Sequence, residues 1–117
     1  MRLEAKKYLH DIRQAARRIS EFTAGKTLQD YQRDAMVRAA VERQFEIIGE
    51  ALSLLARLDA NVVSGISEHR RIVAFRNLLI HGYADVDDRL VWDVVESKLP
   101  VLLREVEALI GDVTRGG

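Results

Sequence analysis

Apolar residues recur every three or four positions along nearly the whole chain, and this period limits the fold more than any other feature. A repeat of this kind places the apolar residues on one face of a helix. No segment shows the sustained apolar–polar alternation that is typical of a strand, and seven glycines with one proline leave little material for the turns of an all-β protein. The sequence therefore predicts an all-α protein. In the first segment the repeating residues are Ala5, Tyr8, Leu9, Ile12, Ala15, Ala16, Ile19 and Phe22.

The repeat and its interruptions predict four helices joined by short connections, which together form an antiparallel four-helix bundle. We expect the helices at about residues 2–22, 28–58 and 67–81 and from residue 87 onward, with a loop at residues 61–65. The second helix carries two apolar stripes. It therefore needs two neighbouring helices, either both from its own bundle or one from another subunit.

Capping residues mark the expected helix ends. Thr27 and Asp30 resemble a capping box, with aspartate in the place of the usual glutamate. Gly82 suits the position just past a helix end, where φ is often positive. Asp85 or Asp87 is expected to cap the last helix.

Pro100 lies inside the apolar run of the last helix. Its ring clashes one turn back along the helix, and it has no N–H to donate. We therefore expect the last helix to be kinked or split near Glu96.

The composition bounds the class of protein. A chain of 117 residues, 48% hydrophobic and 31% charged, is enough for a single folded domain over residues 1–117. Eighteen Lys and Arg against eighteen Asp and Glu give zero net charge, which excludes nucleic-acid binding by bulk positive charge. The absence of Cys excludes disulfides and thiolate zinc sites. No apolar run is long enough to span a bilayer or to resemble a signal peptide, so we expect a cytoplasmic protein without a membrane partner.

Neither a nucleotide loop nor a metal site is indicated. The Gly-Lys-Thr segment at residues 25–27 lacks the first glycine of a P-loop, since Ser20 stands there, and a helix rather than a strand precedes it. His10, His69 and His81 lie far apart without metal-ligand spacing. We expect no metal and no cofactor.

One segment, residues 76–83, brings together groups that suit phosphodiester chemistry. Asn77 and His81 are four residues apart and so share a helical face, Arg76 has the reach to bend toward them, and Tyr83 follows the helix end. Histidine moves protons near neutral pH, and arginine holds phosphate oxygens. No metal is needed if the nucleophile is a neighbouring 2′-hydroxyl, which would restrict the substrate to RNA. The intervening residues 78–80 are expected to be core.

A structural interpretation of the same residues stays open. An arginine near a helix end is usually part of a surface ion pair, and a histidine in the last turn often complements the helix dipole. Spacing alone does not decide between this interpretation and a site.

The segment resembles the motif of the HEPN superfamily, and most of all its HepT-like branch, in which the motif is R-x4-H-x-Y. Here these residues are Arg76, His81 and Tyr83, with Asn77 as the polar residue after the arginine. The resemblance extends to ERQFEIIGEA at residues 42–51, to ADVDDRLVWD at residues 84–93, and to EFTAGKT and SKLPVL. It departs where the family usually has Gly-Met and this chain has Ala74-Phe75, which leads us to expect a changed helix packing angle.

The resemblance implies a HEPN-like four-helix bundle that forms a homodimer and acts as a metal-independent endoribonuclease toxin. It also implies a partner, a minimal nucleotidyltransferase antitoxin of the MntA kind, as in type VII pairs. That antitoxin silences the toxin by adding AMP to the motif tyrosine, which by position is Tyr83. Each AMP adds negative charge and bulk where RNA must lie.

On this hypothesis Arg76 and His81 are catalytic and Asn77 supports them, with two copies placing both motifs in one cleft. Further cations are candidates for holding the RNA backbone, although they are equally well explained as a solvated face. These are Lys6, Arg13, Arg17, Arg70 and Arg71. The alternative function is a non-catalytic helical partner that docks a nucleotidyltransferase and helps to bind its substrate.

Overall fold

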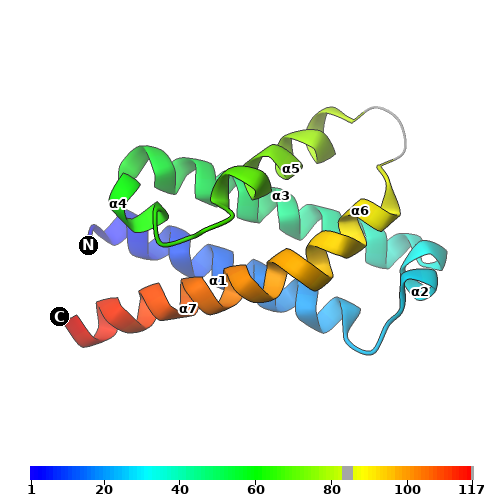
Figure 1. The fold of residues 1–117 in the computed structure, drawn as a ribbon, viewed down its shortest axis with the longest axis horizontal. Coiled ribbons are helices and arrows are strands. Elements are labelled where there is room, and N and C mark those ends of the chain that lie inside the picture. Colours follow the sequence, from blue (N-terminus) through cyan, green and yellow to red (C-terminus); the bar gives the residue numbers. More distant parts are fainter. Residues whose placement is uncertain (83–85, 117) are drawn as a thin grey trace.

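A computed structural model describes residues 1–82 and 86–116, with side chains described to residue 111. Across those residues the structure is helical and contains no strand, so the all-α prediction is confirmed. In Figure 1 the rods α1, α3, α5 and α6–η1–α7 run in alternating directions, as an antiparallel bundle requires. The elements are α1 (Leu3–Thr23), α2 (Leu28–Arg33), α3 (Ala35–Leu58), α4 (Ala60–Val63), α5 (His69–His81), α6 (Asp88–Asp93), the π-helical turn η1 (Val94–Lys98) and α7 (Leu99–Gly116).

The expected second helix is two helices rather than one. The capping box is present: the Thr27 hydroxyl accepts the Asp30 N–H, and the Asp30 carboxylate accepts the Thr27 N–H. These bonds lower the pKa of Asp30. The helix ends at Arg33 because the carboxylate of Asp34 accepts the N–H groups of Met36 and Val37 and thereby starts α3.

Two further local expectations need correction. The segment expected as a loop at residues 61–65 begins inside the short helix α4, which Asp59 caps by accepting the Val62 N–H. Gly82 follows α5 as expected, but its φ is −75° rather than positive. Glycine is required there because a β-carbon would lie 2.7 Å from the Leu78 carbonyl oxygen. The expected cap at Asp87 is confirmed, since its carboxylate accepts the Arg89 N–H; Asp85 lies outside the described residues.

Pro100 disturbs the last helix near Glu96, as the sequence predicts. The turn at Val94–Lys98 is π-helical and includes Glu96, and the Leu99 N–H donates to the Val94 carbonyl, five residues back. A π turn accommodates the missing donor without ending the helix. The α6–η1–α7 segment therefore continues as one rod in Figure 1.

The core lies between α1, α3 and the last rod. The apolar stripe of α1 is fully covered, with Leu9, Ile12 and Ile19 at 0% exposure. Tyr31 of α2 is also fully buried, and its ring lies 5.5 Å from that of Trp92 on α6. Helix α3 packs against two helices of the same chain, α1 and α5, and it meets α5 through Phe45 and Gly49.

Helix α5 is covered on one side only. It packs chiefly on α3, where Phe75 meets Phe45 edge to face at 5.2 Å. The expectation that residues 78–80 are core is wrong for two of the three, because Leu78 and Ile80 are each 47% exposed while Leu79 is buried. Leu78 and Ile80 are two residues apart, about 160° around the helix axis, and therefore lie on opposite flanks of α5. Each is exposed on its own flank.

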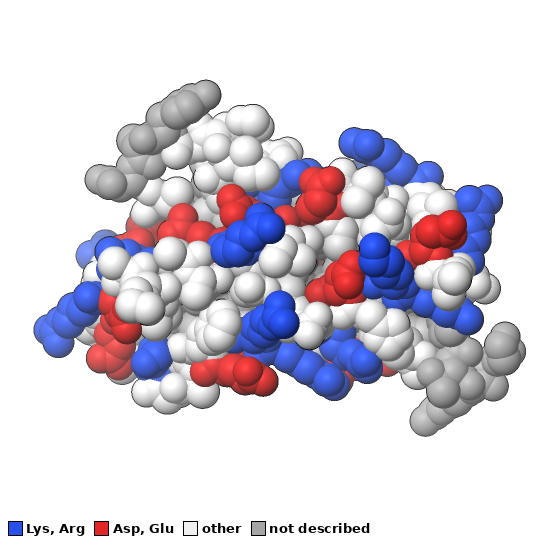
Figure 2. Space-filling model, turned by 180° about the vertical axis from the view of Figure 1, so that it is seen from behind, with Lys and Arg blue, Asp and Glu red and all other residues white. Residues whose placement is uncertain are grey.

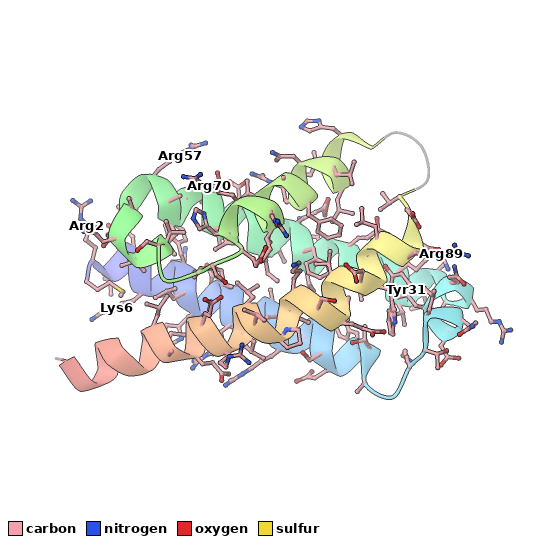
Figure 3. All side chains as sticks on the ribbon, in the orientation of Figure 1. Arg2, Lys6, Tyr31, Arg57, Arg70 and Arg89 are labelled. Carbon is pink, nitrogen blue, oxygen red and sulfur yellow. The ribbon has the colours of Figure 1, made fainter. Side chains whose placement is uncertain are left out.

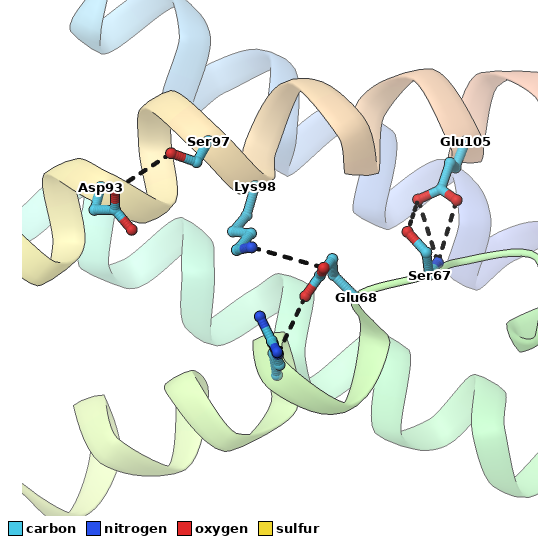
Figure 4. Close-up of polar contacts among 7 residues, drawn as sticks. Ser67, Glu68, Asp93, Ser97, Lys98 and Glu105 are labelled. Carbon is cyan, nitrogen blue, oxygen red and sulfur yellow. Dashed lines mark hydrogen bonds and ion pairs between the residues drawn. The ribbon is translucent and has the colours of Figure 1, made fainter.

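Polar contacts tie the start of α5 to the last rod, as Figure 4 shows. Glu68 pairs with Lys98 of η1 at 3.6 Å and with Arg71 at 3.6 Å. The carboxylate of Glu105 accepts both the N–H and the hydroxyl of Ser67. These contacts fix one end of α5 and leave its C-terminal end, with His81, away from them.

Candidate functional site

The contact between α3 and α5, here called the seam, is especially close at a glycine. At Gly49 the helices approach so closely that a β-carbon would lie 2.5 Å from Cγ of Arg76, and nearer still to its Cβ. Non-bonded carbon atoms do not approach each other to that distance. Gly49 therefore lets the aliphatic part of the Arg76 side chain lie across the backbone of α3.

The charged end of Arg76 meets the residue that follows this glycine. Its Nη1 donates to Oε2 of Glu50 at 2.7 Å. The Arg76 side chain is 14% exposed and that of Glu50 is 58% exposed, so the guanidinium is held at the seam by a partner that solvent and ligands can reach. The Nε of Arg76 is buried without a hydrogen-bond partner in the described part of the chain, which leaves one donor of the guanidinium unsatisfied.

The other predicted site residues lie differently. Asn77 and His81 are exposed and make no hydrogen bond or ion pair within the described residues. Five residues of helix separate Arg76 from His81, which is about 140° around the axis. A single chain therefore does not join the guanidinium to the imidazole, although both belong to α5. Tyr83 lies outside the described residues.

The predicted RNA-binding cations mostly have partners. Arg17 pairs with Glu107 at 2.7 Å, Arg13 donates to His10 at 2.9 Å, and Arg71 pairs with Glu68. Figure 2 shows basic and acidic side chains intermixed on one face of the molecule rather than in a continuous basic surface.

Two of the five cations have no described ion pair. Arg70 is exposed on α5, and Lys6 is half-buried on α1. Helix α1 packs on α3 and α7, whereas α5 packs on α3. The cations of α1 therefore do not adjoin Arg76, and Arg70 is the predicted cation that lies free on the same helix as the motif.

An apolar groove runs between α5 and the last rod. Its volume is about 430 Å³. The groove is bounded by exposed Leu78 and Leu90, with Phe75 beneath. It is lined by Arg71, Ile72, Ala74, Phe75, Leu78, Leu90, Asp93, Val94 and Lys98. The groove thus lies beside the flank of α5 that carries the exposed Leu78.

Sequence reasoning assigned no role to Gly49 and Glu50, although both stand in the ERQFEIIGEA segment. The missing information was spatial, since 26 residues separate Glu50 from Arg76. No group of three or more His, Asp or Glu side chains suited to a metal ion occurs in the part of the chain that the structure describes. None of the described helices is long and apolar enough to cross a membrane.

The chain matches the family model described as "Ribonuclease HepT-like" over residues 12–109. It is 35% identical over 109 residues to "Probable ribonuclease HepT" of Thermococcus cleftensis, an alignment that covers 93% of this chain and 98% of the relative. It is also 35% identical over 104 residues to "Putative RNase MJ1380" of Methanocaldococcus jannaschii, covering 89% and 94% of the two chains. No solved structure gives a significant match. The matched residues include the α3–α5 seam and the whole of α5, and the chain belongs to the HepT-like ribonuclease family of the HEPN superfamily.

Proposed function

We propose that this chain is a metal-independent endoribonuclease that acts as the toxin of a toxin–antitoxin pair. The observation that carries the proposal is the placement of Arg76. It is seated on Gly49 and held by Glu50 on the same helix that presents an exposed His81. The ribonuclease names of the relatives support the same class of reaction.

The reaction needs a proton carrier and a stabiliser of negative charge. The 2′-hydroxyl of the RNA attacks the adjacent phosphorus, the 2′-oxygen–phosphorus bond forms, and the bond to the 5′-oxygen breaks. His81 takes the proton of the nucleophile or gives one to the leaving oxygen. Arg76 stabilises the pentacoordinate phosphate through its guanidinium donors. Asn77 orients His81 or a phosphate oxygen.

A homodimer completes the site in this proposal. Within one chain Arg76 is directed to α3, whereas His81 lies at the exposed end of α5. The uncovered Leu78, with the apolar groove beside it, offers a surface that a second copy buries. Two facing α5 helices bring an imidazole from each chain to one cleft, where one acts as the base and the other as the acid.

The proposed partner is an MntA-like nucleotidyltransferase antitoxin. It transfers AMP from ATP to the hydroxyl of Tyr83 with release of pyrophosphate. The added phosphodiester places negative charge two residues from His81, where anionic RNA must bind. Replacing Tyr83 by phenylalanine should keep the nuclease active and prevent modification. AMP found on another residue by mass spectrometry would overturn this part of the proposal.

The central experiment incubates the purified chain with RNA in EDTA. The wild type should cleave, and His81→Ala should lose activity by about 10²–10⁴-fold, the usual contribution of a positioned acid or base. His10→Ala is the matched control, because that histidine is exposed on α1. Retained cleavage in His81→Ala contradicts the catalytic assignment.

The alternative function is a non-catalytic partner that docks a nucleotidyltransferase and helps to bind its substrate. The ion pair of Arg76 with Glu50 favours this alternative to the extent that it neutralises the guanidinium. Intact RNA in the same assay, together with tight binding to the transferase, would favour the alternative.

A further inference from the structure

A second hollow lies along the α3–α5 seam. Relative to Arg76 it lies toward the N-terminal end of α5, in the opposite direction from His81. Its volume is about 560 Å³. It lies where α3 ends, α4 turns and α5 begins, and it is lined by Ser53, Ala56, Arg57, Ala60, Val63, Ser64, His69, Arg70 and Val73. It shares no lining residue with the apolar groove that we assign to the second copy.

The cations of this hollow are free. Arg57 and Arg70 are exposed, and neither makes an ion pair or a hydrogen bond within the described residues. Figure 3 shows both side chains extending from the same edge of the molecule. None of the described residues that line the hollow is acidic. By contrast, Arg71 and Arg76 on the same helix are both paired with glutamates.

The apolar floor complements these cations. Ala56, Val63 and Val73 contribute aliphatic surface to the hollow that Arg57 and Arg70 also line. An apolar surface flanked by guanidinium groups suits a nucleotide, because the base stacks on a guanidinium plane and covers apolar surface while arginine binds the phosphate. A purely anionic ligand would leave the apolar floor without a complementary contact, and a purely apolar ligand would leave the arginines without one.

The hollow lies two helical turns from the proposed catalytic arginine. On α3, Arg57 follows Glu50 by seven residues, and on α5, His69 precedes Arg76 by seven residues. Seven residues are two helical turns, so each pair shares a helix face about 10.5 Å apart along the axis. Since α3 and α5 run in opposite directions (Figure 1), the hollow lies two turns along the same seam from the Arg76–Glu50 pair.

We propose that this hollow is a nucleotide subsite that binds single-stranded RNA next to the scissile phosphate, with Arg57 and Arg70 holding the backbone. The proposal rests on the proposed ribonuclease function for the identity of the strand. The RNA strand would then run across the protein from the motif at the C-terminal end of α5, along the seam, to α4. It also supplies the local basic patch that a chain of zero net charge needs in order to bind RNA.

The test measures binding without cleavage. A fluorescent eight-nucleotide strand of 2′-O-methyl ribonucleotides has no 2′-hydroxyl to attack, so its affinity for the full-length protein can be followed by anisotropy as the salt concentration is varied. The double variant Arg57→Ala/Arg70→Ala should bind about tenfold more weakly. Its plot of log affinity against log salt should be shallower by about 1.4, the contribution of two phosphate contacts on a single strand.

The matched control is Arg33→Ala/Arg104→Ala, which removes two exposed arginines from α2 and α7. It should match the wild type in affinity and in slope. If Arg57→Ala/Arg70→Ala also matches the wild type, or if both double variants weaken binding equally, the subsite is refuted. A wild type that binds the strand through Arg57 and Arg70 but leaves natural RNA intact would overturn the ribonuclease proposal and leave the subsite standing.

Discussion

The side chain of Arg76 lies directly against Gly49, across the seam between α5 and α3. Gly49→Ala places a methyl group where Arg76 already lies, so α5 must move away from α3. We expect a loss of about 1–3 kcal/mol in the free energy of unfolding, the usual cost of overpacking. The rate of any RNA cleavage should fall as well, since Arg76 is no longer held against the backbone of α3. Urea denaturation and a cleavage assay measure the two effects.

Gly111→Ala is the control for this substitution. Gly111 also lies in a helix, α7, but a β-carbon there meets nothing within 4 Å. Alanine should therefore stabilise the protein by about 0.5–1 kcal/mol through helix propensity. If Gly49→Ala stabilises the protein as Gly111→Ala does, the close approach at the seam is not a constraint in solution.

Glu50 both holds Arg76 and competes with RNA for it. Glu50→Gln keeps an acceptor for the Arg76 N–H but removes the charge that a phosphate must displace, so KM for RNA should fall several-fold with little change in kcat. Glu50→Ala removes the acceptor altogether, and kcat should fall about 10-fold or more because the guanidinium is no longer positioned. Steady-state cleavage kinetics separate the two outcomes.

Glu46→Gln is the matched control on the same helix, since Glu46 pairs with Arg43 at 3.8 Å rather than with the motif. It should leave both kinetic parameters unchanged. A rise in KM for Glu50→Gln would mean that the carboxylate assists RNA binding instead of opposing it.

Leu78 is the residue on which the proposed dimer is most easily tested. It is 47% exposed beside the apolar groove, and Leu78→Glu would place a charge in the interface. We expect dissociation into single chains, with a dimer dissociation constant at least about 100-fold higher because the charge is buried unpaired. Light scattering over a concentration series measures it. Met36→Glu changes an apolar residue that is 84% exposed on α3 and should leave the dimer intact. A wild type that remains a single chain at high concentration contradicts the proposal.

The sequence predicted those parts of the fold that depend on local chemistry. The buried face of α1 follows from its apolar period, and the caps at Thr27 and Asp87 follow from side chains that accept nearby N–H groups. The break at Asp34 was missed because one aspartate does not interrupt the apolar repeat around it.

The candidate site was predicted only in part. Residues 76–81 were identified from their types and spacing, but the pairing of Arg76 with Glu50 depends on how two helices pack. The exposure of Leu78 and Ile80 was missed for a related reason. An apolar side chain indicates that something covers it, but not whether the cover comes from the same chain.

Glu42 gives the folded protein a pH dependence of known sign. Burial, together with the carboxylates of Asp88 and Glu46, raises its pKa, and Arg38 opposes the shift. At neutral pH the folded state therefore carries a charge that it disfavours relative to the unfolded chain. Glu42→Gln removes that charge and should raise the free energy of unfolding at pH 7. The advantage of the variant should shrink as the pH falls from above the ordinary titration range of glutamate into that range, because the folded wild type takes up its proton first. Glu21→Gln, at an exposed glutamate of α1, is the control variant. Urea denaturation at a series of pH values measures both variants, and an advantage for Glu42→Gln that grows on acidification would reverse the assigned direction of the shift.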